Sequence, residues 1–180
     1  IKVPELAKDL LEQISFEARD SEYIDHKSGV SARMSITAFE NLLSTAERRI
    51  LMTGSEETTL RFGDFLGVIP AITGKVELVY EGEQEGAAFV AMELIGAAVK
   101  TLFPEYFPKI EKLQKPDATT PYDDLVEWFF ESSGFELPDD LSDSEYKEQL
   151  DSIEPLNELI QKYQPNIETS DKYFMKEFLL

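Results

Sequence analysis

The sequence predicts a mostly α-helical bundle with at most one short β-hairpin. Apolar residues recur at helical spacings of three, four and seven, most clearly between residues 36 and 50. Pro and Gly residues separate these stretches, and only residues 75–80 alternate in the manner of a strand. With 180 residues and 42% hydrophobic content, the chain is long enough to bury the core of one or two small domains.

The first two helices have recognisable starts and ends. Residues 4–18 place Pro near the first turn of a helix and apolar residues along one face. A turn at residues 28–31 follows, in which Ser28 or Ser31 can cap the next helix. That helix is expected to run to about Met52 and to end at Thr53-Gly54.

The middle of the chain is more broken. Residues 62–69 have a short helical pattern, which we expect Pro70 and Gly74 to end. Residues 75–80 are rich in β-forming residues and are expected to form one short strand. Gly82 and Gly86 are expected to bracket an acidic turn.

Residues 87–103 are apolar nearly all round, a pattern typical of a helix at the centre of a core. A linker at 115–121 then separates two expected domains, a helical domain at 1–114 and an acidic helical extension at 115–180. Helices are expected after Pro121, after a capping box at Ser142 and Glu145, and at 155–163 and 170–180. The last of these is expected to expose an apolar end: Phe174, Phe178, Leu179 and Leu180.

Charge excludes one class of partner. The formal net charge is −19, and residues 117–158 hold fourteen acidic residues against Lys147 alone. Nucleic-acid binding requires clustered Lys and Arg, so DNA and RNA are not expected as partners. The acidic residues are read as a solvated face, or alternatively as a docking surface for a basic protein or for metal ions.

Cellular location is inferred from what the sequence lacks. The chain contains no cysteine, which excludes disulfides and thiolate metal sites. No signal peptide is visible, and no apolar run approaches the ~18–20 residues that a membrane-spanning helix needs. We therefore expect a cytoplasmic protein without a membrane partner.

Arg33 is the leading candidate site residue. It is expected in the first turn of the long helix, where the helix dipole disfavours a cation. A bound anion would explain this position, because a planar guanidinium binds a phosphate through two hydrogen bonds. The alternative is an ordinary surface arginine.

Three further arginines and one histidine are weaker candidates. Arg19, Arg48 and Arg49 are expected near helix ends, where they complement the dipole or form ion pairs; the alternative is contact with a neighbouring subunit. His26 has no partner ligands of familiar spacing. The acidic run 139–145 lacks the glycine and the spaced ligands of an EF-hand. We therefore predict no metal site.

The region around Arg33 resembles the C-terminal lid of AAA+ ATPases of the magnesium-chelatase and MoxR-like clade. The resemblance covers the bacterial group described as magnesium chelatase or sigma-54-interacting ATPase. It rests on these residues: Ala18-Arg19, Ser28-Gly29-Val30-Ser31, Arg33, Ile36 and Asn41 through Arg49, with weaker blocks at 73–78 and 97–103. It implies that Arg33 is the sensor 2 arginine, which reaches the γ-phosphate of a bound nucleotide.

The nucleotide-binding parts of such an ATPase are absent from this sequence. Gly67 and Gly74 are separated by six residues where a Walker A loop has four, and Val76 follows Lys75 in place of Ser or Thr. No acidic Walker B strand occurs. We therefore expect a lid fragment with no catalytic residue or cofactor of its own, whose AAA+ core lies upstream in the same chain.

The resemblance also implies the partners of the parent chain. These are ATP and Mg²⁺, further copies in a homo-oligomeric ring, and a von Willebrand A-type protein. The alternative function is an acidic helical adaptor with no nucleotide link. A third is an enzyme that uses paired carboxylates from residues 117–158.

Overall fold

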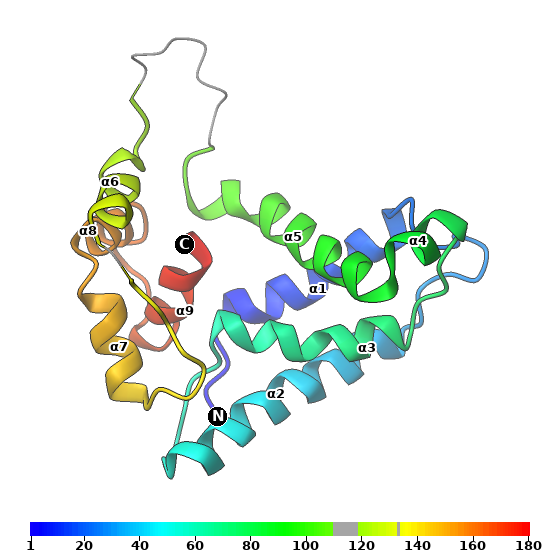
Figure 1. Ribbon diagram of the computed structural model, residues 1–180, viewed down its shortest axis with the longest axis horizontal. Helices are drawn as coiled ribbons and strands as arrows, with labels where there is room; N and C mark the ends of the chain where they lie inside the picture. Colours follow the sequence, from blue (N-terminus) through cyan, green and yellow to red (C-terminus); the bar gives the residue numbers. More distant parts are fainter. Residues whose placement is uncertain (110–118, 133) are drawn as a thin grey trace.

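The fold is mostly α-helical, as the sequence predicts (Figure 1). The computed structural model describes residues 1–109, 119–132 and 134–180. These residues form nine α-helices and one 3₁₀-helix, and no residue in the described ranges belongs to a β-strand. The boundary at 114/115 and most of the linker predicted at 115–121 lie outside the described residues.

Helices α1 (Glu5–Asp20) and α2 (Arg33–Thr53) form a hairpin. A hydrogen bond of 3.1 Å between the hydroxyls of Ser15 and Ser35 joins the end of α1 to the start of α2. The predicted end of α2 is confirmed, because Gly54 adopts φ +68° and its N–H donates to the Ile50 carbonyl. Ala32 is the residue before α2, and the Ser31 hydroxyl accepts from the Arg33 N–H at 3.3 Å.

A 3₁₀-helix, η1 (Phe62–Val68), leads directly into α3 (Ile69–Thr73). The prediction that Pro70 stops this pattern was wrong. Pro70 lies in the first turn of α3, where a missing N–H removes no helical hydrogen bond. Both elements pack along α2, and the approach at Gly67 is close: a Cβ there would lie 2.1 Å from Thr45 Oγ1.

The strand predicted at 75–80 is not formed. Val76 and Leu78 make two isolated antiparallel bridges, to Val30 and Ile24. The facing chain is the loop between α1 and α2, which turns too sharply to continue the pairing. The expected acidic turn was also wrong, because those residues form α4 (Tyr80–Glu85).

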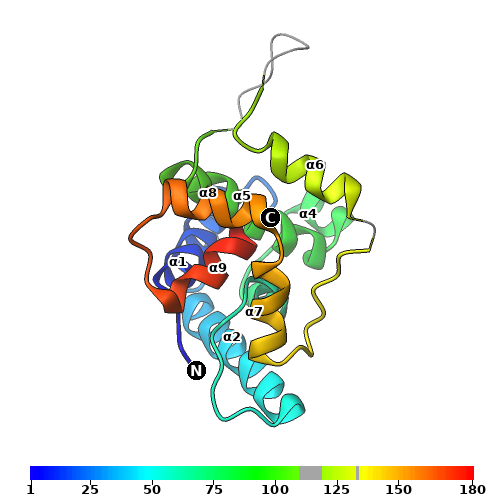
Figure 2. The ribbon, with the colours of Figure 1, turned by 90° about the vertical axis from the view of Figure 1, so that its left-hand side faces the viewer.

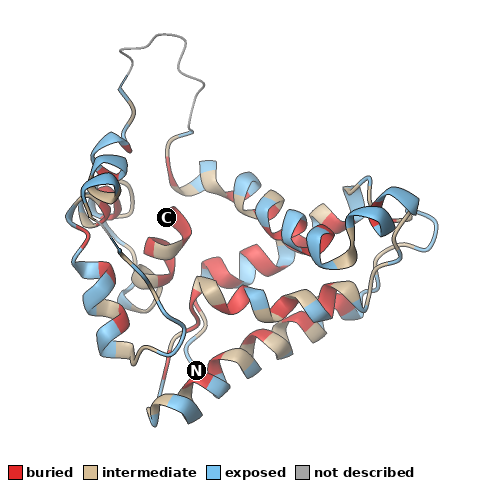
Figure 3. Ribbon diagram, viewed as in Figure 1, coloured by how far each residue is buried: buried red, intermediate tan, exposed pale blue. Residues whose placement is uncertain are grey.

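Helix α5 (Ala87–Tyr106) was predicted to lie at the centre of the core, and it does not. One face is buried against α1 and α3, while Phe89 and Met92 on the other face are 43% and 46% exposed. Pro104 lies inside the last turn of α5. Figure 3 shows buried and exposed positions alternating along this helix.

The sequence-based expectation about membrane segments also needs correction. By length and composition alone, α5 is long and apolar enough to cross a membrane, with a mean hydropathy of 1.5. One third of that window is buried within this fold. Core helices of soluble proteins meet the same criterion, so this helix does not establish a membrane location.

The C-terminal region contains four helices: α6 (Asp123–Glu131), α7 (Asp143–Asp151), α8 (Glu154–Tyr163) and α9 (Thr169–Leu179). The predicted capping box of α7 is confirmed, since the Ser142 N–H donates to Glu145 Oε2 at 2.9 Å and the Ser142 hydroxyl accepts from the Glu145 N–H at 3.4 Å.

Helix α9 lies between the C-terminal helices and the α1–η1 surface (Figures 1 and 2). The prediction of an exposed apolar end was therefore wrong for Phe174, Phe178 and Leu179, which are buried; only Leu180 is exposed. The Phe62 ring lies 6.0 Å from that of Phe174 and 6.3 Å from that of Phe178. The two halves of the chain thus share one hydrophobic cluster.

Candidate functional site

Arg33 is the first residue of α2, and its side chain is exposed. Within the described part of the chain its guanidinium forms no ion pair or hydrogen bond. No acidic residue lies in the first turn of this helix. The positive charge is therefore added to the positive end of the helix dipole without internal compensation.

The loop before Arg33 is built on Asp25. The Asp25 carboxylate accepts from the Lys27 N–H at 2.8 Å and from the Ser28 hydroxyl at 3.1 Å. The backbone carbonyl of Asp25 accepts from the N–H of Gly29, which adopts φ +70°. This φ favours glycine, so the sequence fixes a tight local turn.

Backbone hydrogen bonds fasten the same loop to residues 75–79. The Asp25 N–H donates to the Glu77 carbonyl at 2.8 Å, and the Ser31 N–H donates to the Lys75 carbonyl at 3.4 Å. The Val79 N–H donates back to the Tyr23 carbonyl at 3.0 Å. The backbone that carries Arg33 is therefore held in a defined position relative to the bundle.

Arg19 lies at the same end of the hairpin as Arg33. It is in the last turn of α1, it is exposed, and its guanidinium lies 5.6 Å from the centre of the Phe16 ring. Arg48 and Arg49 lie near the other end of α2, about 22 Å away at 1.5 Å per residue. The structure thus divides the four candidate arginines between two separate sites.

Arg49 is directed into the fold and only 5% of it is exposed. Its guanidinium forms two hydrogen bonds with the Asp64 carboxylate, of which the bond from Nη2 to Oδ2 measures 3.0 Å. Nη2 also donates to the Thr59 carbonyl at 3.1 Å. The Asp64 Oδ2 also accepts from the Arg61 N–H at 2.8 Å, so the same carboxylate caps the start of η1.

Arg61 is a second buried cation, which sequence reasoning did not select. It donates to the Leu141 carbonyl at 2.8 Å, lies 3.5 Å from Asp143 Oδ1 and stacks 4.1 Å from the centre of the Tyr146 ring. Burial lowers the pKa of Arg61, and the charge of nearby Arg49 acts in the same direction. The only sequence signal is an arginine set between apolar Leu60 and Phe62.

Glu177, which is half-buried, extends this group. Its Oε2 accepts from the Tyr146 hydroxyl at 2.7 Å and from the Phe62 N–H at 2.6 Å. Burial raises the pKa of Glu177, although these two hydrogen bonds oppose the shift. Burial and the adjacent carboxylate together raise the pKa of Tyr146. The polar network therefore connects α2 and η1 to α7 and α9.

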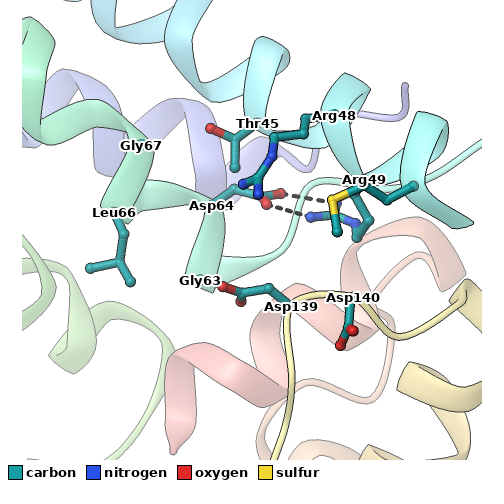
Figure 4. A pocket seen from close by; sticks show the side chains of 10 residues that line it. Thr45, Arg48, Arg49, Gly63, Asp64, Leu66, Gly67, Asp139 and Asp140 are labelled. Carbon is teal, nitrogen blue, oxygen red and sulfur yellow. Dashed lines mark hydrogen bonds and ion pairs between the residues drawn. The ribbon is translucent and has the colours of Figure 1, made fainter.

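A cavity of about 280 Å³ lies beside this network, between α2, η1 and the loop before α7 (Figure 4). Arg48 lines it from α2, and Asp139 and Asp140 face it from the loop. Gly63 and Gly67 of η1 also line it. Among the described residues, no three His, Asp or Glu side chains are grouped closely enough to hold a metal ion.

Comparison with known protein families, curated proteins and solved structures gives no match to this chain.

Proposed function

We propose that this chain is the nucleotide-sensing lid of an AAA+ ATPase similar to the magnesium-chelatase and MoxR-like group, with Arg33 as the residue that binds the γ-phosphate. The observation that carries this proposal is the placement of Arg33. An exposed guanidinium is presented in the first turn of a 21-residue helix by a loop that the bundle holds in place.

Electrostatics supports an anion as the ligand. Buried Arg49 and Arg61 are neutralised by Asp64 and Asp143, whereas Arg33 has no such partner among the described residues. A phosphate at this position would interact with the guanidinium and with the positive end of the helix. It would thereby remove an unfavourable interaction of about 0.3–1 kcal/mol between Arg33 and the helix dipole.

The packing of α2 supports a coupling role. α2 contacts α1, η1 and α3, and η1 contacts α9. A force applied to Arg33 by a bound nucleotide would therefore move the helices together and not the arginine alone. This is the behaviour required of a lid that reports the presence of ATP.

In this proposal the remaining components belong to the cytoplasmic parent chain and its assembly. An AAA+ core upstream in the same chain supplies the site for ATP and Mg²⁺, and further copies complete the ring. The lid itself supplies no catalytic residue. Exposed Arg19 and Arg48 are then candidates for contact with a neighbouring subunit, and a von Willebrand A-type protein is a candidate partner.

The test is ATP hydrolysis by the parent chain carrying Arg33→Ala or Arg33→Lys. We expect Arg33→Ala to lower kcat at least about tenfold, which is about 1.4 kcal/mol of lost transition-state stabilisation. Arg33→Lys is expected to restore activity only in part, because an ammonium cannot form the two-point contact.

Lys27→Ala is the matched control, since Lys27 is an exposed cation in the same loop. It is expected to leave kcat unchanged, and circular dichroism should show equal helix content in all variants. A fully active parent that carries Arg33→Ala would contradict the proposal.

A second candidate function is the acidic adaptor. Among the described acids of residues 119–158, only Asp143 and Asp151 form ion pairs, and most of the others are exposed. This surface favours a basic protein partner. Salt-sensitive binding of a basic protein that is unaffected by Arg33→Ala, together with an indifferent ATPase, would support the adaptor instead.

A further inference from the structure

The outer face of α5 carries a partly exposed apolar stripe. Its residues are spaced by three and four along the helix and therefore lie on one side: Phe89, Met92, Gly96, Val99 and Phe103. Phe89, Met92 and Gly96 are exposed, whereas Val99 and Phe103 are half-buried and also pack against the core. Beside this stripe lies a shallow cavity of about 560 Å³, lined by Gly96, Val99, Lys100, Phe103, Pro104 and Lys109. Such a face suits another helix, because a regular stripe of this spacing is what helix pairs bury.

Gly96 is the middle of the stripe and its most open point. It is exposed, and no described atom lies within 4 Å of the position that a Cβ would take. A glycine at this point costs helix stability, yet it lets a second helix approach the backbone closely.

The pattern around Gly96 is symmetric. Phe89 lies seven residues before Gly96, and Phe103 lies seven residues after it. At about 100° per residue, Glu93 and Lys100 lie on one flank of the stripe, about 4.5 Å and 6 Å along the axis on either side of Gly96. Met92 and Val99 lie on the opposite flank in the same way.

The charges on this face have no partner among the described residues. Glu93 and Lys100 are both exposed, and neither forms an ion pair with any residue that the structure describes. A bilayer or a purely apolar partner would leave both charges uncompensated. A useful partner must therefore offer a cation opposite Glu93 and an anion opposite Lys100.

We propose that this face binds a second copy of the chain, with the two α5 helices antiparallel across a two-fold axis at Gly96. A two-fold axis that is perpendicular to both helices brings the same flank of each helix together. Glu93 then lies opposite the partner subunit's Lys100, and Lys100 lies opposite the partner subunit's Glu93. Each Phe89 meets the partner's Phe103, and each Met92 meets the partner's Val99. This interface is independent of nucleotide sensing.

The antiparallel direction follows from the charges. A parallel two-fold pair would bring opposite flanks together, so Glu93 and Lys100 would lie against the partner's Met92 and Val99 and would have no opposite charge to pair with. The antiparallel pair gives each charge an opposite charge and retains the apolar contacts. The same stripe on two copies of the chain therefore pairs in the antiparallel direction only, as in an isologous interface.

Charge reversal tests this pairing in the 180-residue chain. Glu93→Lys and Lys100→Glu, made singly, each create like-charge contacts across the axis and should weaken dimerisation at least about threefold at low salt. The double variant restores both pairs in reversed order and should return the dissociation constant to near the wild-type value. Sedimentation equilibrium measures all four proteins, and circular dichroism checks their folding.

The absence of cysteine allows a second, geometric test. Two Gly96→Cys side chains would face each other at the axis and should form a disulfide-linked dimer under mild oxidation. Leu51→Cys is the matched control, because Leu51 is 84% exposed and lies on α2, away from this face. It should remain largely monomeric under the same conditions.

The results discriminate between self-association and other uses of the face. Rescue by the double variant together with selective cross-linking of Gly96→Cys supports the proposal. A monomer at all concentrations up to several hundred micromolar would overturn it. So would a dimer that is indifferent to the single charge reversals, or binding of α5 to lipid vesicles without any self-association.

Discussion

Arg49 and Asp64 form a two-point ion pair inside the fold, with exposed fractions of 6% and 3% for the two side chains. The pair joins the C-terminal half of α2 to the start of η1, across 15 positions of the chain. A buried ion pair of this kind is costly to break, because the remaining charge has no water to replace its partner.

Asp64→Ala should therefore destabilise the chain by about 3–5 kcal/mol, the usual cost of leaving one member of a buried pair uncompensated. Asp64→Asn should cost less, since an amide oxygen still accepts from the Arg61 N–H. Unfolding by urea measures both variants. Glu57→Gln is the control, because Glu57 pairs with Lys2 at the surface and its loss should not change the midpoint measurably. Equal midpoints for Asp64→Ala and the control would contradict the prediction.

Glu177 should make stability depend on pH. Burial raises its pKa above the usual value of about 4.3, so the folded state binds its proton more tightly than the unfolded state does. The resulting stabilisation is fully present below the unfolded pKa, and it is lost as the pH rises through the raised folded pKa. Wild-type stability should thus gain relative to Glu177→Gln as the pH falls from neutrality towards 4.

Comparison with Glu177→Gln isolates this contribution from that of other acids. The glutamine keeps an oxygen acceptor for the Phe62 N–H but does not titrate. The pKa of Asp151 is shifted in the opposite direction, below its usual value. Burial alone would raise its pKa, but the hydrogen bonds from Lys176 and Tyr173 and the charges of Lys176 and Lys172 hold it below its usual range. A constant difference between wild type and Glu177→Gln from pH 7 to pH 4 would show that Glu177 is not perturbed.

Gly67→Ala should be destabilising although alanine favours helices. The added Cβ would lie 2.1 Å from Thr45 Oγ1 and 3.3 Å from Thr45 Cβ, so either η1 moves away from α2 or Thr45 rotates and gives up its hydrogen bond to the Asn41 carbonyl. Such overpacking costs about 1–3 kcal/mol. Combination with Thr45→Ala should recover much of the loss. Gly96→Ala, which meets no neighbouring atom, is the matched control and should stabilise the monomer slightly at low protein concentration.

The sequence predicted the elements whose ends are determined locally. Helices α1 and α2 have Pro4 and Gly54 at their ends, and α7 has its Ser142 capping box; these features depend on neighbouring residues only. The prediction failed at 75–80 because a strand also needs a partner. The alternation is real, since Val76 and Leu78 both form bridges, but the facing loop cannot extend the ladder.

The candidate site was predictable in part for the same reason. The position of Arg33 at the start of a long helix follows from local spacing, while its role remains a prediction. The polar group of buried Arg49, Asp64 and Arg61 and half-buried Glu177 is assembled from residues up to 128 positions apart, so no local pattern predicts it. Helix α5 was misplaced because an almost uniformly apolar sequence does not indicate which of its faces the fold covers.

The contact between α1 and α9 has a consequence for folding during synthesis. The Glu5 N–H at the start of α1 donates to Asp171 Oδ2 in α9 across 166 positions, and α9 also covers Phe62 and Phe65. At about 5–20 residues per second, a ribosome needs roughly 8–30 seconds to pass from the end of α1 to the start of α9. During that interval the aromatic surface of η1 is open to chaperones and to other nascent chains, so the yield of folded protein should depend on synthesis rate more than its final stability suggests.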